Sequence, residues 1–138
     1  MHIYQTTLLL KNHQRGFHLI TNKIQTILDE YRISTGTINI FIKHTSASLS
    51  INENADPTVR DDIENFYDEL ADDKSYYIHT YEGSDDMPAH IKSSILGQSL
   101  TIPITNNKLN LGTWQGIYFG EHRDSPSTRE LVITITGE

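Results

Sequence analysis

Residues 37–44 read TINIFIKH, and their character alternates strictly between two faces. Ile38, Ile40 and Ile42 share one face with His44, while the intervening residues form the other. Alternation with a period of two is typical of a half-buried β-strand whose apolar face turns to the core. His44 continues the apolar face at the end of the strand, where we expect the core to open to a polar cleft.

Other β-rich runs lie toward both ends of the chain, bounded by turn residues. The additional strands predicted from them cover residues 3–10, 16–20, 49–52, 99–105, 113–123 and 129–136. A turn over residues 12–16 predicts that the first two of these strands form a hairpin.

Helical patterns occupy the middle of the chain. The first helix is predicted from apolar residues at helical spacing, with Thr21 or Asn22 as its cap: Ile24, Ile27, Leu28 and Tyr31. A second begins with Asp56 as cap and Pro57 in its first turn. A third runs from about Met87 to Leu96, capped by Asp85 or Asp86 and ended by Gly97. This order predicts an α+β fold, with a mainly antiparallel, two-layer, sandwich-like β core flanked by short helices.

Length and composition narrow the class of protein. The 138 residues predict a single domain, and the hydrophobic fraction of 36% is ordinary for a folded chain. The absence of cysteine excludes a disulfide framework, a Cys-ligated metal and a thiol nucleophile. No apolar run approaches the roughly 20 residues of a membrane helix, and the N-terminus lacks a signal-peptide pattern. We therefore expect a cytoplasmic protein without a membrane partner.

The net charge of −7 argues against a nucleic-acid-binding surface, which needs clustered Lys and Arg. Much of the acid lies between Glu53 and Asp86, whereas Arg123 and Arg129 lie close together near the C-terminus. A local basic pocket for a small anion remains compatible with this distribution.

Polar side chains gather after the 37–44 strand. Thr45 and Ser46 follow His44 and offer hydroxyl groups suited to a phosphate or carboxylate. Glu53 and Asn54 precede the second helix, whose N-terminus favours anions. Each feature also has a plain structural explanation, a hydrogen-bonded rim histidine for the first and a polar loop for the second.

Two more histidines, His79 and His90, lie eleven positions apart and are joined by an acidic loop that contains Gly83. His90 falls in the first turn of the third helix, so its side chain points back toward the loop. Together with His44 they make a candidate three-histidine metal site with one position open to water or substrate. The spacing matches no short metal motif, and carboxylate ligands and other divalent ions are equally compatible.

Three blocks resemble the secondary thiamine-phosphate synthase family, the YjbQ-like proteins. They are residues 44–56 (HTSASLSINENAD), 82–92 (EGSDDMPAHIK) and 111–123 (LGTWQGIYFGEHR). The resemblance implies a small α+β protein that assembles as a homotrimer and holds a divalent metal ion, zinc or magnesium, at His44, His79 and His90.

The resemblance also implies a reaction, the joining of hydroxymethylpyrimidine diphosphate to a thiazole phosphate with loss of diphosphate. We predict Glu53 and Asp86 as catalytic carboxylates, and a set of partners for the small phosphorylated metabolite: Thr45, Ser46, Asn54, Lys92 and Arg123. The same groups suit metal-assisted phosphate-ester hydrolysis. Two other possibilities are a non-catalytic trimeric protein that binds a metal or phosphorylated metabolite, and a purely structural trimer interface.

Overall fold

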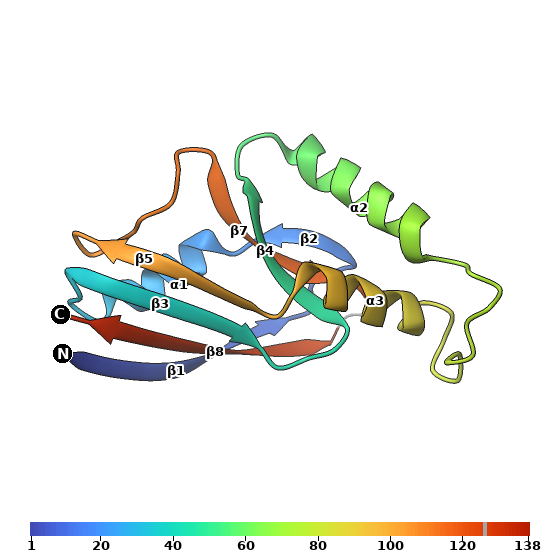
Figure 1. Cartoon of the computed structure of the whole chain (residues 1–138), viewed down its shortest axis with the longest axis horizontal. Coiled ribbons are helices and arrows are strands. Elements are labelled where there is room, and N and C mark those ends of the chain that lie inside the picture. Colours follow the sequence, from blue (N-terminus) through green and yellow to red (C-terminus); the bar gives the residue numbers. More distant parts are fainter. Residues whose placement is uncertain (126) are drawn as a thin grey trace.

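The chain forms two antiparallel β-sheets with three helices, as seen in a computed structural model that describes residues 1–125 and 127–138 (Figure 1). The elements are β1 (His2–Lys11), β2 (Gly16–Leu19), α1 (Thr21–Asp29), β3 (Thr35–Ile42), β4 (Ala47–Glu53), α2 (Pro57–Ala71), α3 (Asp86–Leu96), β5 (Ser99–Thr105), β6 (Lys108–Leu109), β7 (Gln115–Glu121) and β8 (Thr128–Gly137). One sheet has the order β1-β8-β3-β5-β6 and the other β2-β7-β4. The predicted α+β class with mainly antiparallel sheets is confirmed.

The hydrophobic core lies between the two sheets. Ile38, Ile40 and Ile42 of β3 are all buried, as their alternation predicts. Ile117 and Phe119 of β7 belong to the same cluster of buried residues, although they come from the smaller sheet. The two sheets therefore share one apolar interior, and truncation of a core isoleucine to alanine would cost about 2–5 kcal/mol.

The predicted hairpin between residues 3–10 and 16–20 is wrong. β1 pairs along its whole length with β8, whereas β2 pairs with β7 in the other sheet. Between the two strands, Asn12 and Gly16 adopt positive φ angles of 61° and 130°. The turn thus carries the chain out of one sheet and into the other instead of folding it back on itself.

The predicted signals are confirmed at the start of α2 and the end of α3, whereas at the start of α3 the predicted cap residue Asp85 makes no side-chain capping bond. The backbone N–H of Thr58 donates to Asp56 Oδ1 over 2.9 Å at the start of α2, as predicted. Gly97 ends α3 with a φ of 104°, a conformation that favours glycine. The cap predicted for α1 is wrong, because that helix has no side-chain cap and Thr21 Oγ1 instead accepts a hydrogen bond from Ile117 N over 2.9 Å.

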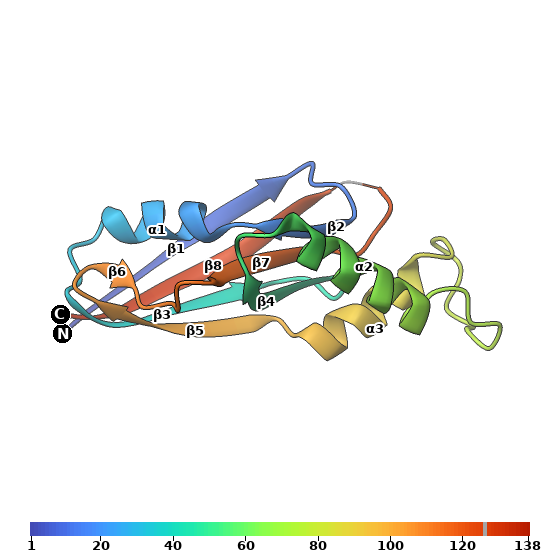
Figure 2. The same ribbon diagram turned by 90° about the horizontal axis from the view of Figure 1, so that it is seen from above.

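Helices α2 and α3 lie side by side at the end of the molecule that is remote from both termini (Figures 1 and 2). The connection 72–85 joins the end of α2 to the start of α3. Arg123 and Asp124, which follow β7, hydrogen-bond to Asp85 at the end of this connection. In the described part of the chain, no helix has the length and apolar character that crossing a membrane requires.

Candidate metal centre

His79, Asp86 and His90 form a group that we call the histidine cluster, located where the 72–85 connection enters α3. Asp86 is the first residue of α3 and is 1% exposed, and His90 lies one turn later on the same face. His79 Nε2 is 2.9 Å from Asp86 Oδ2, and His90 Nε2 is 3.2 Å from Asp86 Oδ1. The three side chains each place one potential ligand atom within 4.8 Å of the other two.

Hydrogen bonds fix the orientation of the cluster. His90 Nδ1 donates to the carbonyl of Thr45 over 2.9 Å, so in the neutral ring Nε2 carries a lone pair. Asp86 Oδ1 accepts from Arg123 Nη1 over 2.8 Å. Asp86 Oδ2 is buried and accepts no hydrogen bond from the residues that the structure describes. With a neutral ring, the Nε2 lone pair of His90 faces Asp86 Oδ1 over 3.2 Å, an arrangement that a metal ion or a proton on the ring would satisfy.

The cluster fits a divalent metal ion. Two imidazole nitrogens and one carboxylate oxygen are a common ligand set for a metal with coordination positions left for water or substrate. A bond from the second ring nitrogen of His90 to a backbone carbonyl is the usual support of a ligating histidine. The side chain of His79 is 56% exposed, so the cluster is open to solvent.

Arg123 is engaged within the protein. Its Nε donates to Asp85 Oδ2 over 2.8 Å and its Nη2 to the carbonyl of Glu82 over 3.0 Å, in addition to its bond to Asp86. Burial opposes the charge of Asp85, but the Asp124 N–H and the guanidinium outweigh it and hold the pKa of Asp85 below its ordinary value. The hydrogen bond to Asp85 raises the pKa of Arg123. The predicted phosphate partner is therefore placed to hold Asp86.

His44 lies beside the histidine cluster without joining it. Its Nε2 accepts a hydrogen bond from Glu130 N over 2.9 Å, and burial together with the charge of Arg129 lowers its pKa. Its neighbour Thr45 supplies the carbonyl that orients His90. Within this subunit the structure brings together two of the three predicted histidines, with Asp86 as the third member.

Glu53 and Asn54 occupy a different corner of the fold. Glu53 Oε2 accepts from Asp56 N over 3.2 Å just before α2. Asn54 Nδ2 donates to the carbonyls of Thr113 and Gln115, each over 3.1 Å, and so ties the end of β4 to the start of β7. This corner leads into α2, whereas the cluster lies at the start of α3 (Figure 1).

Ser46 and Lys92, two further predicted phosphate partners, are both buried. The carbonyl of Ser46 accepts from Arg129 Nη2 over 3.2 Å. Lys92 is 0% exposed, and its Nζ lies 2.7 Å from Asp68 Oδ1 and 3.1 Å from Asp72 Oδ1 of α2. A phosphate at the surface does not reach Lys92 in this arrangement, which corrects its predicted role to that of a buried counter-ion.

Comparison with known proteins settles the family. The profile described as UPF0047 protein YjbQ-like matches residues 5–138. The chain belongs to the YjbQ-like family. It is 48% identical over 136 residues to the UPF0047 protein YjbQ of Escherichia coli O157:H7, covering 98% of this chain and 99% of that protein. It is 43% identical to the UPF0047 protein sll1880 of Synechocystis, with coverage of 98% and 92%.

Solved structures agree with this assignment. A crystal structure of an uncharacterized conserved yjbq/upf0047 family protein from Clostridium acetobutylicum superposes with a TM-score of 0.86 at 42% identity, covering 95% of this chain and 99% of that one. A YbjQ-like protein of unknown function from Sulfolobus solfataricus gives a TM-score of 0.89 at 25% identity, with 99% of each chain covered. The family resemblance of the three sequence blocks is thereby confirmed.

A buried ion pair of this YjbQ-like chain was missed from the sequence. Arg129 Nε donates to Glu121 Oε2 over 2.8 Å, and both side chains are buried. The sequence contained a signal for this ion pair, because Arg129 alternates with Leu131 and Ile133 and so shares the buried face of β8 with them. An arginine on a core face requires a buried acid, and this pair joins the two sheets.

His122, whose role the sequence left open, forms a second buried pair with Ser48. His122 Nε2 lies 2.8 Å from Ser48 Oγ, and both residues are 0% exposed. Burial, reinforced by the charge of Lys92, lowers the pKa of His122 to about 3, so the ring is neutral. A Cβ at Gly120 would lie 2.4 Å from Ser48 Oγ, so the space beside the pair is closed. The YjbQ-like fold uses this serine and histidine as internal structure.

Proposed function

We propose that this YjbQ-like chain is a cytoplasmic, metal-dependent enzyme that joins hydroxymethylpyrimidine diphosphate to a thiazole phosphate with loss of diphosphate. The observation that supports metal dependence is the convergence of lone pairs from His90 and Asp86, with His79 beside them. The choice of reaction rests on the family resemblance of the sequence blocks.

Each residue of the site has a separate task in this proposal. His79, Asp86 and His90 would hold the cation, which neutralises charge on the departing diphosphate. Arg123 keeps Asp86 aimed, and the exposed Thr45, next to His90, offers a hydroxyl to a phosphate oxygen. Two imidazole ligands favour zinc over magnesium, since magnesium prefers oxygen ligands.

A second candidate is a non-catalytic protein that binds a metal or a phosphorylated metabolite. The position of Glu53 favours it, because this predicted catalytic carboxylate serves the start of α2 and lies away from the cluster. Asp86 would itself be a metal ligand. Binding alone requires no general acid or base, so the described side chains of the cluster suffice for it.

We also propose that the chain acts as a homotrimer. Ile78 and Tyr81, on either side of His79, are 95% and 98% exposed, and large apolar side chains in such positions are often covered by another subunit. A neighbouring subunit there could bring its own His44 or Glu53 to the cluster. Sedimentation velocity tests this, because a monomeric species at working concentration would contradict it.

Metal binding is tested by zinc titration of the metal-free full chain, followed by calorimetry, and by the metal content of the purified protein. We expect one zinc ion per subunit in the parent and none in His79→Ala or His90→Ala. His2→Ala is the matched control, since His2 is an exposed histidine at the far end of the fold. Equal zinc binding in all four proteins would refute the metal centre.

Catalysis is tested by thiamine phosphate formation from the two substrates. We expect product with the parent and with His2→Ala, and none with His79→Ala. Zinc binding without product would leave the non-catalytic candidate. Undiminished product from a folded His79→Ala variant would show that the reaction does not use the cluster, and Glu53→Gln shows separately whether Glu53 contributes.

A further inference from the structure

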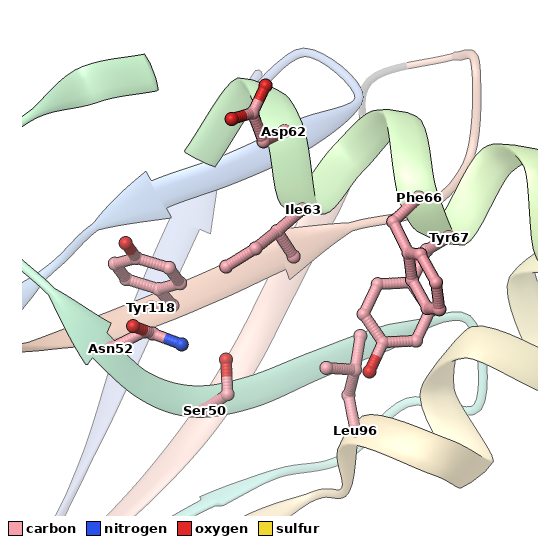
Figure 3. A pocket seen from close by; sticks show the side chains of 8 residues that line it. All are labelled: Ser50, Asn52, Asp62, Ile63, Phe66, Tyr67, Leu96 and Tyr118. Carbon is pink, nitrogen blue, oxygen red and sulfur yellow. The ribbon is translucent and has the colours of Figure 1, made fainter. Parts of the chain in front are cut away.

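A hollow of about 370 Å³ lies beneath the middle of α2, against β4, β7 and the end of α3 (Figure 3). Aromatic rings of Phe66, Tyr67 and Tyr118 and the aliphatic side chains of Ile63 and Leu96 line it. Its volume falls in the range of small-molecule pockets, roughly 300–1,000 Å³. The histidine cluster lies at the other end of α3, so the hollow is a separate feature.

The floor of the hollow presents hydrogen-bond donors. Asn52 Oδ1 accepts from Glu53 N over 2.8 Å, and because only the oxygen of an amide accepts, Nδ2 is directed elsewhere. Figure 3 shows this nitrogen and the hydroxyl of Ser50 facing the hollow. Within the described residues, neither group hydrogen-bonds to another protein side chain or carbonyl. A ligand with an acceptor would satisfy both.

The aromatic walls are held in place and one of them is accessible. Tyr118 is buried, and its hydroxyl donates to the carbonyl of Glu53 over 2.5 Å. Phe66 is 61% exposed and meets Tyr67 edge to face, with ring centroids 5.4 Å apart. A planar ligand that enters beneath α2 would therefore cover the Phe66 ring. It would contact that ring in the offset-stacked or edge-to-face geometry that aromatic pairs prefer.

Charged side chains of both signs lie beside the hollow. Asp62 is one of its lining residues, and the Arg60 guanidinium lies 6.0 Å from the centroid of the Tyr118 ring, which also lines it. The aromatic rings and the donors of Asn52 and Ser50 therefore define the ligand, and net charge does not.

We propose that this hollow binds a planar heteroaromatic molecule that carries a hydrogen-bond acceptor. Phe66 and Tyr67 stack against the ring, and Asn52 Nδ2 and Ser50 Oγ donate to a ring nitrogen or carbonyl. The proposal does not depend on the function of the histidine cluster, because it uses different residues on a different surface.

The test is an NMR titration of the full chain with two isosteric probes, 7-azaindole, which has a pyridine-type acceptor, and indole, which lacks one. We expect amide shifts centred on Ser50, Phe66 and Leu96, with 7-azaindole about fivefold tighter than indole, the effect of one ordinary hydrogen bond.

Two variants and one control sharpen the test. Asn52→Asp keeps the acceptor for Glu53 N but removes the donor, so the preference for 7-azaindole should vanish. Asn65→Asp makes the same chemical change on the exposed surface of α2 and should retain it. Phe66→Ala, at an exposed position, should weaken binding of both probes. Absence of saturable shifts, equal affinity for 7-azaindole and indole, or burial of the hollow by a second copy of the chain would overturn the proposal.

Discussion

Two clusters of charged side chains flank helix α3 and differ in how their polar atoms are satisfied. In the ionic cluster, between α2 and α3, each cation meets carboxylates at 2.6–3.4 Å; its members are Arg15, Glu64, Asp68, Asp72 and Lys92. In the histidine cluster, acceptors of His90 and Asp86 face each other and Asp86 Oδ2 has no aligned donor among the described residues. Both clusters contain buried acid and unsatisfied acceptors, since Glu64 Oε2 and Asp72 Oδ1 of the ionic cluster also lack an aligned donor. The clusters differ in that two imidazole rings face the acid in the histidine cluster, whereas no histidine belongs to the ionic cluster.

One of the two unsatisfied acceptors of the ionic cluster belongs to Glu64, which a proton neutralises. Burial, followed by the charge of Asp68, raises the pKa of Glu64 to about 7. The carboxyl is therefore substantially protonated near neutrality, which relieves the repulsion among the acids of α2. The comparison teaches that unsatisfied acceptors alone do not identify a ligand site, and the proposed metal centre depends on the two imidazole rings beside Asp86.

The largest effect that would test this comparison is expected from Asp86→Asn. The amide keeps the shape of Asp86 but removes the charge and a strong ligand, so stoichiometric zinc binding should be lost. Asp68→Asn makes the same change in the ionic cluster, where we expect normal zinc binding. Calorimetric titration of both variants decides the matter, and equal zinc affinity in the two would erase the distinction between the clusters.

Lys92→Met should have the opposite pattern of effects: it should lower the stability of the fold and leave zinc binding unchanged. The methionine fills the buried space but removes the ammonium, so Asp68 and Asp72 keep Arg15 as their remaining cation, and we expect a cost of about 2 kcal/mol in the free energy of unfolding. Urea denaturation measures this loss, with the exposed Lys23→Met as control. Zinc affinity of the folded variant should equal that of the parent, and a stability within 1 kcal/mol of the parent, an ordinary surface effect, would contradict the buried counter-ion role.

A smaller, pH-dependent effect is expected from Glu64. Its pKa is about 7 in the folded chain against an ordinary 4.5, so the folded state holds more protons between these values. Stability should therefore fall as pH rises from about 4.5 to about 7, by about 1 kcal/mol for this partly exposed group. Glu64→Gln, which stays neutral, should flatten that part of the curve. An unchanged slope in urea melts across this range would show that Glu64 ionises normally.

The sequence predicted the helices and strands better than the contacts of the buried polar side chains. Alternation in 37–44 and the cap at Asp56 depend on local spacing, and both were confirmed. The false hairpin arose because a turn signal at Asn12 and Gly16 does not say in which sheet the next strand finds its partner. Strand pairing is decided by contacts between residues far apart in the chain.

The candidate site was predicted in part for the same reason. His79 and His90 were placed together because a loop and a helix turn bring them close, and Asp86 lies on the same helix face. Spacing could not show that Lys92 turns to acids on α2, or that Glu53 caps a distant corner. Those contacts depend on how the elements pack in three dimensions. Periodicity in the sequence predicts which face of an element a side chain lies on, but it does not predict which residue that side chain will contact.

The smallest expected effect on zinc binding is that of His44→Ala. It tests whether His44 belongs to the metal centre, as the predicted three-histidine set requires, or lies outside it, as in the single subunit. His44 Nε2 already accepts from Glu130 N, so His44→Ala should cost about 1 kcal/mol of stability through the lost hydrogen bond. Loss of a residue that supports a metal ligand typically weakens metal binding 10–100-fold. His44 has no such role in this subunit, so the zinc affinity of His44→Ala should stay within about threefold of the parent. Zinc titration of the folded variant measures this. A larger loss would mean that His44 ligates the metal, in which case its ring must leave Glu130 or reach the cluster of a neighbouring subunit.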